Sequence, residues 1–329
     1  MTARPSFFIG AYTSDMGGEA TGIAVLDSRT DGSLAFREVV GAAESPSYLA
    51  ADRGVLYAVA EATGRVTRFA RGDRDALLAT ASAESGGDAP CQLTVAGESL
   101  FVANYTSGSV GVIALDDFEL VETLAGSGSG PHEAQDGPHA HATHVLSDGI
   151  VVSADLGADL IHRHRFADGR LARVSSIAVP AGTGPRDFHE PAPGLLWVLG
   201  ELSCELLVFA ATADGLEPVS TTAIPGAEPG DHAAGIAVSA DGRFAYVGLR
   251  GSNRVAWFAV SPDSRELTPR GSVPSAGDFP RHLVVDGNFL HVANQLSSTV
   301  STFDTKENGH PELVREPEPV PSPTFLLRA

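Results

Sequence analysis

Four histidines fall within one short segment, residues 131–144, which reads PHEAQDGPHAHATH. An imidazole can act as a general base near neutral pH or bind a metal ion, and His139, His141 and His144 could together ligate zinc. In an extended segment, however, His139 and His141 point to one side and His144 to the other, and the sequence contains no HExxH pattern. The segment therefore favours catalysis through His141 over a metal site or a merely polar loop, with His132 and His144 in solvated or structural roles.

The chain around this segment is built from a repeated pattern that is typical of β-hairpins. Each copy is an apolar strand, a short polar turn and a second, alternating strand. The copies occupy residues 56–69, 100–113, 151–166, 196–209, 245–258 and 290–303, with a seventh, irregular copy at 7–26. No stretch has a convincing helical period, so the pattern predicts an all-β chain. His162 and His164, in the second strand of the third copy, are expected on its exposed outer face.

The spacing of the hairpins predicts the number of units. Equivalent positions at residues 60, 104, 155, 200, 249 and 294 are separated by 44 to 51 residues. Further strand-like pieces lie between the hairpins, so each unit holds about four strands, the content of a β-propeller blade. A chain of 329 residues then holds about seven such units. The sequence predicts a seven-bladed β-propeller with four antiparallel strands per blade, formed as a single domain by residues 1–329. Residues 323–329 are expected to pair with the first blade.

Two sets of equivalent positions would lie at one end of the predicted channel. The first set directly follows the first strand of each hairpin and comprises Glu61, Tyr105, Leu156, Glu201, Arg250 and Gln295. The second set lies ahead of that strand and, with small gaps allowed, comprises Ser47, Cys91, His141, Arg186, Ala234 and Arg281. His141 thus occupies the position that holds arginine in two other blades. Arginines gathered there would form a local positive pocket that suits a carboxylate or phosphate.

The composition limits which binding partners and which cellular location are expected. The net charge is −19 and Lys306 is the only lysine, which argues against nucleic acid and anionic membranes as partners. The two cysteines, Cys91 and Cys204, form no disulfide framework or CxxC motif. No apolar run is long enough for a signal peptide or a membrane span, so a cytoplasmic location is expected. No P-loop, dinucleotide fingerprint or GxSxG elbow is present, and we expect no cofactor. A monomer is expected by default.

Several short phrases occur in a characteristic order along nearly the whole chain. They are IGAYT, LYAVAE, FVANYTSGSV, PHAH with ADLGAD, GTGPRDF with GELS, SADGRFAYVGLRGSN, and FPRHL with VANQLSSTV. In order and spacing the chain resembles the seven-bladed β-propeller lactonase family. That family includes the bacterial propeller-type 6-phosphogluconolactonases and the fungal carboxy-cis,cis-muconate lactonizing enzymes.

The resemblance implies a metal-independent site built from histidine, arginine and glutamate. Carried over by motif, its catalytic residues are His141, Arg186 in GPR, Glu201 in GELS and Arg250 in GLRGSN. With the two sets of positions above, the expected substrate-binding residues are Arg281, Gln295, Glu61, Tyr105 and His139. The sequence departs from the family at Gly200, where asparagine is usual, and at Ala233 or Ala234, where an acidic residue is frequent. These departures bear on the substrate fit.

Opening a lactone requires a base to activate water and donors for the carbonyl oxygen as it becomes anionic. We expect His141 to be the base, Arg186 and Arg250 to hold the substrate and its oxyanion, and Glu201 to orient a partner or pass a proton. The expected activity is 6-phosphogluconolactonase-like hydrolysis of a small anionic lactone, a reaction of carbohydrate metabolism in the pentose phosphate pathway. The alternatives are a lactonizing, muconate-type cycloisomerase on the same fold and a non-catalytic propeller that binds a partner.

Overall fold

The repeat predicted from the sequence is present as seven consecutive antiparallel sheets, which we call blades 1 to 7. The computed structural model describes residues 6–212 and 215–329. Six blades have four strands, and blade 7 carries a fifth short strand beside its main path. Helical structure in the described residues is limited to three single turns, η1 (Ser14–Met16), η2 (Glu61–Thr63) and η3 (Asp73–Asp75). The predicted all-β class, with seven four-stranded β-propeller blades, is confirmed.

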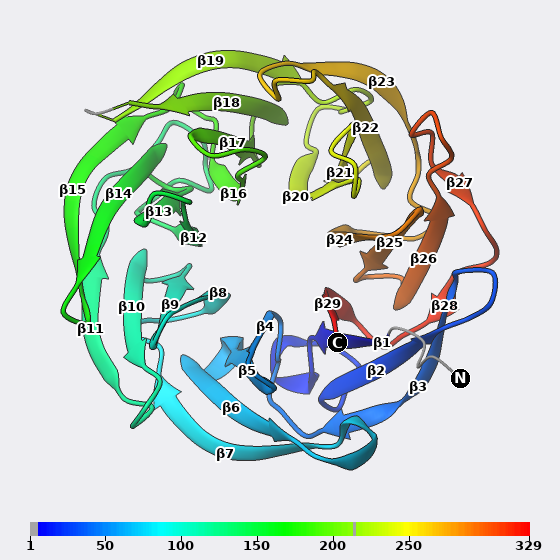
Figure 1. Ribbon diagram of the computed structural model, residues 1–329, viewed down its shortest axis with the longest axis horizontal. Coiled ribbons are helices and arrows are strands. Elements are labelled where there is room, and N and C mark those ends of the chain that lie inside the picture. The colour runs from blue at the N-terminus through cyan, green and yellow to red at the C-terminus, as the bar shows by residue number, and fades with distance from the viewer. Residues whose placement is uncertain (1–5, 213–214) are drawn as a thin grey trace. The chain divides into compact units, whose positions relative to one another are not determined.

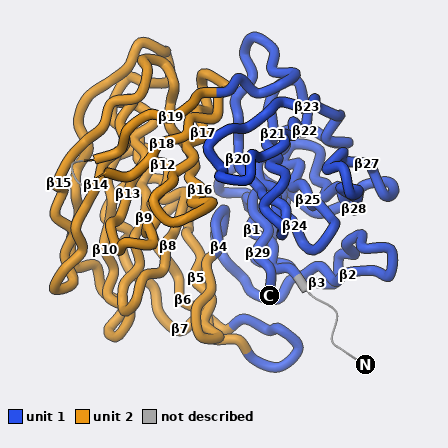
Figure 2. The backbone as a smooth tube through the Cα atoms, turned by 45° about the horizontal axis from the view of Figure 1, so that its top comes forward, with its two compact units in different colours: residues 1–49, 72–77, 222–329 blue, residues 50–71, 78–221 orange. Residues whose placement is uncertain are grey.

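The chain divides by its internal contacts into two compact units, coloured separately in Figure 2. Unit 1 comprises residues 1–49, 72–77 and 222–329, and unit 2 comprises residues 50–71 and 78–221. The expectation of a single domain over residues 1–329 stays a prediction.

Unit 2 contains blades 2 to 5, apart from the ends of three strands. Blade 2 comprises β4 (Leu49–Asp52), β5 (Val55–Ala60), β6 (Arg65–Arg71) and β7 (Leu77–Glu84). Blade 3 comprises β8 (Pro90–Ala96), β9 (Ser99–Asn104), β10 (Ser109–Ala114) and β11 (Leu120–Ala125). Blade 4 comprises β12 (Ala140–Val145), β13 (Ile150–Asp155), β14 (Leu160–Ala167) and β15 (Arg170–Ala178). Blade 5 comprises β16 (Pro185–His189), β17 (Leu195–Gly200), β18 (Glu205–Ala211) and β19 (Leu216–Ala223). In each blade the strands pair in chain order, as Figure 1 shows for blade 4.

Unit 1 contains blades 1, 6 and 7. Blade 1 comprises, in spatial order, β29 (Pro323–Arg328), β1 (Ser6–Ala11), β2 (Ile23–Ser28) and β3 (Leu34–Gly41). Blade 6 comprises β20 (His232–Val238), β21 (Phe244–Arg250), β22 (Arg254–Val260) and β23 (Leu267–Pro274). Blade 7 comprises β24 (Pro280–Asp286), β25 (Phe289–Asn294), β26 (Thr299–Asp304), β27 (Glu312–Leu313) and β28 (Glu318–Pro319).

The C-terminal strand completes the first blade, as the sequence suggested. β29 pairs with β1, so that Phe8 lies opposite Leu327 and Ile9 opposite Leu326. The sequence alone did not say which strand this segment supplies, and the structure answers that it is the first strand of blade 1. Pairing the two ends of the chain covers an edge of β1 that would otherwise expose unpaired backbone groups.

The burial of each strand follows from its place in the blade. The second strand of blade 5, LLWVLG, is buried at every residue, because a strand covered on both faces can be continuously apolar. The last strand of the same blade begins with a buried leucine and three exposed residues, and then alternates between half-buried and exposed positions. Between blades 4 and 5 the apolar side chains form a shared core that includes Val152, Leu196 and Leu207. This packing fixes the first strands of the two blades, which carry two of the predicted site residues.

The expectation that His162 and His164 are exposed is wrong. They are 4 % and 0 % exposed. His164 Nε2 lies 2.9 Å from the hydroxyl of Ser153, and His162 Nδ1 lies 2.7 Å from that of Ser176. Each imidazole has one ring nitrogen within hydrogen-bond distance of a hydroxyl group in the blade interior, while Nε2 of His162 and Nδ1 of His164 are buried without a hydrogen-bond partner among the described residues.

Candidate active site

A β-bulge presents His141 at the start of β12. Ala140 pairs with Asp155 and Ala142 pairs with Ala154, so His141 is an extra residue in the ladder. A bulge bends the strand and re-aims the side chain of the inserted residue, and bulges are frequent next to active sites. The direction of the His141 side chain is therefore set by the bulge as well as by the alternation of side chains along the strand.

The same irregularity recurs at the equivalent position of other blades. The inserted residues in the first strands of blades 3, 4, 5 and 7 are Cys91, His141, Arg186 and Arg281. Blade 6 carries one extra residue between Ala233 and Ile236. These are the residues that matched in the sequence only when small gaps were allowed. Because the bulge lies at the same place in each of these strands, the gaps come from the turns that follow, which differ in length: Ala96 pairs with Ser99 in blade 3, and Val145 pairs with Val151 in blade 4. We call this position the bulge position.

In unit 2, Arg186 joins two of the other predicted catalytic residues. Its Nη1 atom lies 2.7 Å from Nε2 of His141 and also donates a hydrogen bond to Oε2 of Glu201. Arg186 and Glu201 are 7 % and 8 % exposed, whereas His141 is half-buried. A buried guanidinium beside a carboxylate is oriented as well as neutralised. The three side chains, which lie 45 and 15 residues apart along the chain, form one hydrogen-bonded group.

The hydrogen bond from Arg186 also defines the state of the His141 ring. A guanidinium has only donors, so Nε2 of His141 must be the acceptor. An imidazole that accepts at Nε2 is neutral and carries its proton on Nδ1. In this arrangement His141 has the lone pair that a general base requires.

Glu201 is placed by the backbone that surrounds it. It directly follows β17, and its amide donates a 2.8 Å hydrogen bond to the carbonyl of Gly184. Gly200, where the family usually has asparagine, lies against the same segment: a Cβ atom there would be 2.5 Å from Ser203 Oγ and 2.9 Å from Thr183 Cγ2. The glycine therefore fits a close approach of two backbone segments just before the glutamate.

Tyr105 and His139 form an aromatic wall beside His141. The Tyr105 ring stacks on His139, with centroids 4.5 Å apart and planes 10° apart, and meets His141 edge to face at 5.8 Å. His139 Nδ1 lies 2.9 Å from the Tyr105 carbonyl, and its Nε2 lies 3.1 Å from Oδ1 of Asp136. Both predicted binding residues thus contact the bulged segment. Glu61 also lies in unit 2, where it begins η2 directly after β5 and is 8 % exposed.

Two residues that were not predicted as part of the site support the bulged strand. Asp155 is 1 % exposed, and its Oδ1 accepts hydrogen bonds from the amides of His139 at 2.8 Å and Ala158 at 3.1 Å. The thiol of Cys91 lies 3.5 Å from the carbonyl oxygen of His141, so Cys91 is a packing residue next to the site. A polar residue at the end of an otherwise apolar strand is the sequence signal for Asp155. Asn104 and Asn294, its equivalents in two other blades, are likewise 0 % exposed.

The remaining predicted residues lie in unit 1. Arg250 ends β21, is 7 % exposed, and donates to the carbonyls of His232 at 3.3 Å and Ala233 at 3.4 Å. Arg281, at the bulge position of β24, donates to Oε1 of Gln295 at 3.2 Å, and its guanidinium carbon lies 4.8 Å from the centre of the Tyr12 ring. That these residues act on the same ligand as His141 stays a prediction.

The other histidines of the first segment have separate surroundings. Nδ1 of His132 accepts a hydrogen bond from the amide of Ala134, and Nε2 of His144 lies 3.9 Å from Oε2 of Glu190. Within residues 6–212 and 215–329, no group of three or more His, Cys, Asp or Glu side chains is arranged to hold a metal ion. In the same described part of the chain, no helix is long and apolar enough to cross a membrane.

Comparison with known proteins decides the family. The sequence matches the family described as "Lactonase, 7-bladed beta-propeller" over residues 6–327. The chain belongs to this family. The lactonase-family chain is 30 % identical to a 6-phosphogluconolactonase of Bacillus subtilis (strain 168), over 97 % of each chain.

Solved structures agree with this assignment. A protein from Lactobacillus plantarum has a TM-score of 0.92 and 26 % identity to the lactonase-family chain, over 99 % of each chain. A periplasmic gluconolactonase of Pseudomonas aeruginosa has a TM-score of 0.89 and 28 % identity, again over 99 % of each chain. The resemblance noted from the sequence is therefore confirmed at the level of the family.

Proposed function

We propose that this lactonase-family chain hydrolyses sugar lactones without a metal ion, with 6-phosphogluconolactone as its substrate. The observation that carries the proposal is the bridge that Arg186 makes between His141 and Glu201. It supplies a neutral imidazole, an oriented guanidinium and a carboxylate at one bulged strand pair. The names of the Bacillus subtilis and Pseudomonas aeruginosa relatives, a 6-phosphogluconolactonase and a gluconolactonase, support the same class of substrate.

In the proposed reaction His141 is the general base. Once the substrate has drawn the Arg186 donor away from Nε2 and freed its single lone pair, that nitrogen takes a proton from water as the water oxygen adds to the lactone carbonyl carbon. The carbonyl oxygen becomes an oxyanion, which Arg186 stabilises after turning its donor from His141 to the substrate. Arg250 is a second donor for the same charge. The ring C–O bond then breaks, and the imidazolium returns the proton to the leaving alkoxide. The product is the open hydroxy acid.

Glu201 has a positioning role in this scheme. Its hydrogen bond to Nη1 of Arg186 keeps the guanidinium plane fixed while that group exchanges its imidazole partner for the substrate. Tyr105 and His139 bound the site on the side of the bulge through their contacts with His141 and with each other. Glu61, Arg281 and Gln295 are proposed to bind the polar or anionic groups of the lactone.

The test is the rate of lactone opening above the spontaneous rate. The wild-type chain should accelerate hydrolysis of 6-phosphogluconolactone, and His141→Ala should lower turnover by about 100-fold or more. His132→Ala, which removes an exposed histidine of the same segment, is the matched control and should keep wild-type turnover. EDTA should leave the rate unchanged.

Three outcomes would count against the proposal. Full turnover by a folded His141→Ala variant would rule out His141 as the general base. Loss of activity in EDTA would indicate a metal site. Failure of the wild-type chain to open any sugar lactone would favour a lactonizing activity or a binding role. A cytoplasmic location and a monomeric state stay predictions, and cell fractionation and sedimentation test them.

A further inference from the structure

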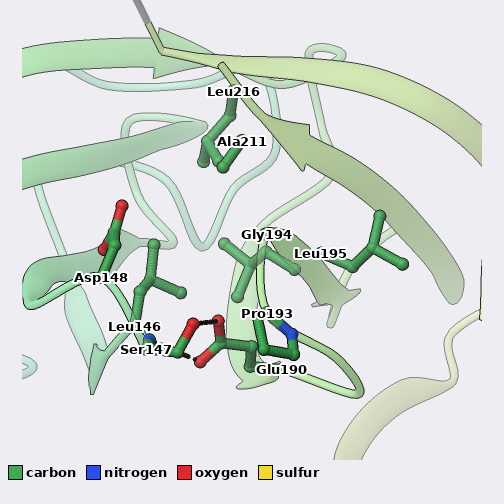
Figure 3. Close-up of a pocket in the computed structure, with 10 residues that line it drawn as sticks. Leu146, Ser147, Asp148, Glu190, Pro193, Gly194, Leu195, Ala211 and Leu216 are labelled. Atoms are coloured by element: carbon green, nitrogen blue, oxygen red, sulfur yellow. Dashed lines mark hydrogen bonds between the residues drawn. The ribbon is translucent and has the colours of Figure 1, made fainter. Parts of the chain in front are cut away.

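A cavity in unit 2 lies at the end of β12 and β16 that is opposite to His141 and Arg186. It has a volume of about 220 Å³ and lies between the turn after β12 and the segment that joins β16 to β17, with β18 and β19 at its far side (Figure 3). His141 is the second residue of β12, whereas Leu146 and Ser147, which line the cavity, follow its end. Five residues of extended chain separate the two places by about 16 Å. The cavity is therefore a separate location from the candidate active site.

The walls of the cavity are apolar. The apolar side chains that line it are Leu146, Pro193, Leu195, Leu196, Ala211 and Leu216. At Gly194 a Cβ atom would find no other atom within 4 Å, so the wall is open there. Surfaces of this kind favour a hydrophobic ring or alkyl group over water.

One edge of the cavity is negatively charged. Glu190 is 12 % exposed, and its two oxygens accept hydrogen bonds from Ser147, one from the amide at 2.9 Å and one from the hydroxyl at 2.8 Å (Figure 3). A carboxylate has about four acceptor positions, so Glu190 retains acceptor capacity after both bonds. Asp148 is the other acidic residue of the lining, which contains no lysine or arginine.

The histidines near Glu190 do not balance its charge at neutral pH. Burial lowers the pKa of His144, and it lowers the pKa of His189 to about 4, with the charge of His144 as a second cause. Both imidazoles are therefore neutral at pH 7, although His144 Nε2 is only 3.9 Å from Oε2 of Glu190. The charge at this edge favours a cation and disfavours an anionic lactone.

We propose that this cavity binds a small organic cation, with an ammonium group at Glu190 and an apolar body among the leucines. The size supports a ring with a short arm, because an apolar cavity of about 150 Å³ already holds benzene. An arylalkylammonium ion combines the required volume, the apolar surface and a single positive charge that can donate hydrogen bonds to a carboxylate. This site is independent of the proposed lactone chemistry.

The experiment compares three ligands of one shape and different charge. Phenethylammonium, 2-phenylethanol and phenylacetate are titrated into the full chain at pH 7 by calorimetry. Only the cation should bind measurably. Glu190→Gln should weaken its binding about 10-fold or more, since a charge-assisted hydrogen bond is lost. Glu217→Gln, on the exposed face of the same blade, is the matched control and should bind like the wild type.

Two further variants separate this site from the active site. Ala211→Leu should fill the cavity and abolish binding, whereas His141→Ala should leave binding unchanged. The proposal is overturned if the three ligands bind equally, if none binds, or if Glu190→Gln keeps full affinity. Calorimetry measures only the heat of ligand binding and does not depend on lactone hydrolysis. A failure to bind the cation therefore leaves the lactonase proposal intact, and a loss of lactonase activity leaves the cation-binding proposal intact.

Discussion

Arg186 and Arg281 occupy the same bulge position in different blades, yet their contacts differ in kind. Arg186 donates to an imidazole and a carboxylate, while Arg281 donates to the amide oxygen of Gln295 and lies over the ring of Tyr12. The carboxylate holds Arg186 in one plane beside a base, which suits a donor that must meet a developing charge. An amide and an aromatic face orient a guanidinium without neutralising it.

From this difference we propose that one backbone feature serves two chemical purposes. The bulge re-aims whichever side chain it carries. The residue after the second strand, Glu201 in blade 5 or Gln295 in blade 7, then determines whether the arginine is paired with a carboxylate or with an uncharged amide. We expect Arg186 to act on the reacting atoms and Arg281 to bind the charged end of the substrate. The following predictions test that division, from the largest expected effect to the smallest.

Replacing Arg186 by lysine should have the largest effect. Lysine keeps the charge but lacks the planar set of donors that reaches His141 and Glu201 together. We expect kcat to fall by about 100- to 1000-fold, as for the loss of an oxyanion donor, with KM changed much less. Arg173→Lys, on an exposed strand, is the control for a generic arginine-to-lysine change. A kcat near the wild-type value would show that Arg186 does not act on the reacting atoms.

Glu201→Gln should have a smaller effect on the same parameter. The amide can still accept one hydrogen bond from Arg186, but it no longer supplies a charge-assisted bond. We expect kcat to fall by about 10- to 100-fold, because the orientation of the donor is relaxed while the donor itself remains. Steady-state kinetics and a thermal melt on the same sample separate this from misfolding. An equal loss in kcat for Glu201→Gln and Glu205→Gln would contradict a specific role.

Arg281→Gln should act on binding and spare the chemical step. We expect KM for 6-phosphogluconolactone to rise about 10-fold, which corresponds to about 1.4 kcal/mol, with kcat within about twofold of the wild type. Gluconolactone, which lacks the phosphate, should be affected much less. An equal loss of kcat for both substrates would mean that Arg281, like Arg186, acts on the reacting atoms. The proposed division of roles between the two arginines would then be wrong.

The smallest effect concerns stability, and it must be known before pH–rate profiles of these variants are interpreted. Burial lowers the pKa of His164 to about 3, with the charges of His162 and Arg173 as further causes, and lowers that of His291 to about 4. Their folded-state pKa values lie below the ordinary 6.5, so between pH 6.5 and about 4 the unfolded chain binds more protons than the folded one.

The free energy of unfolding should therefore fall as the pH is lowered through this window. Each of these buried histidines should cost about 1 to 2 kcal/mol between pH 7.5 and pH 5. Urea unfolding at the two pH values measures the change, and His164→Gln should reduce it. Equal stability of the wild type at both values would contradict the burial of neutral imidazoles.

Most of the fold could be predicted from local sequence, whereas the site could be predicted only in part. The hairpins follow from apolar alternation and short polar turns, and the blade number follows from their spacing. His141 and Arg186 were placed in equivalent positions, but only by allowing gaps in the alignment. The gaps reflect turns of different length after the first strand, and no residue type marks the bulge that these positions share. His162 and His164 were misplaced because β14 is buried on both faces from Ile161 to His164, which an alternating pattern does not reveal.

Asp155 shows a second limit of the sequence. Its polar character at the end of an apolar strand was visible, but its role depends on the amides of His139 and Ala158, and only the tertiary structure brings those to the carboxylate. Likewise, the sequence could name Arg186 and Glu201 as candidates without specifying that one Nη1 atom serves both Glu201 and His141. Hydrogen-bond partners are set by positions within a few tenths of an ångström, which residue spacing does not encode.

The sequence by itself determined the repeat, the number of blades and the residue types available at each bulge position, since these depend on periodicity and composition. Only the tertiary structure decided that β29 completes blade 1, that two histidines are buried, and that an imidazole, a guanidinium and a carboxylate share one hydrogen-bonded group. These outcomes depend on how separate strands pair and pack. Such long-range contacts arise from the fold as a whole and leave little trace in any single stretch of the chain.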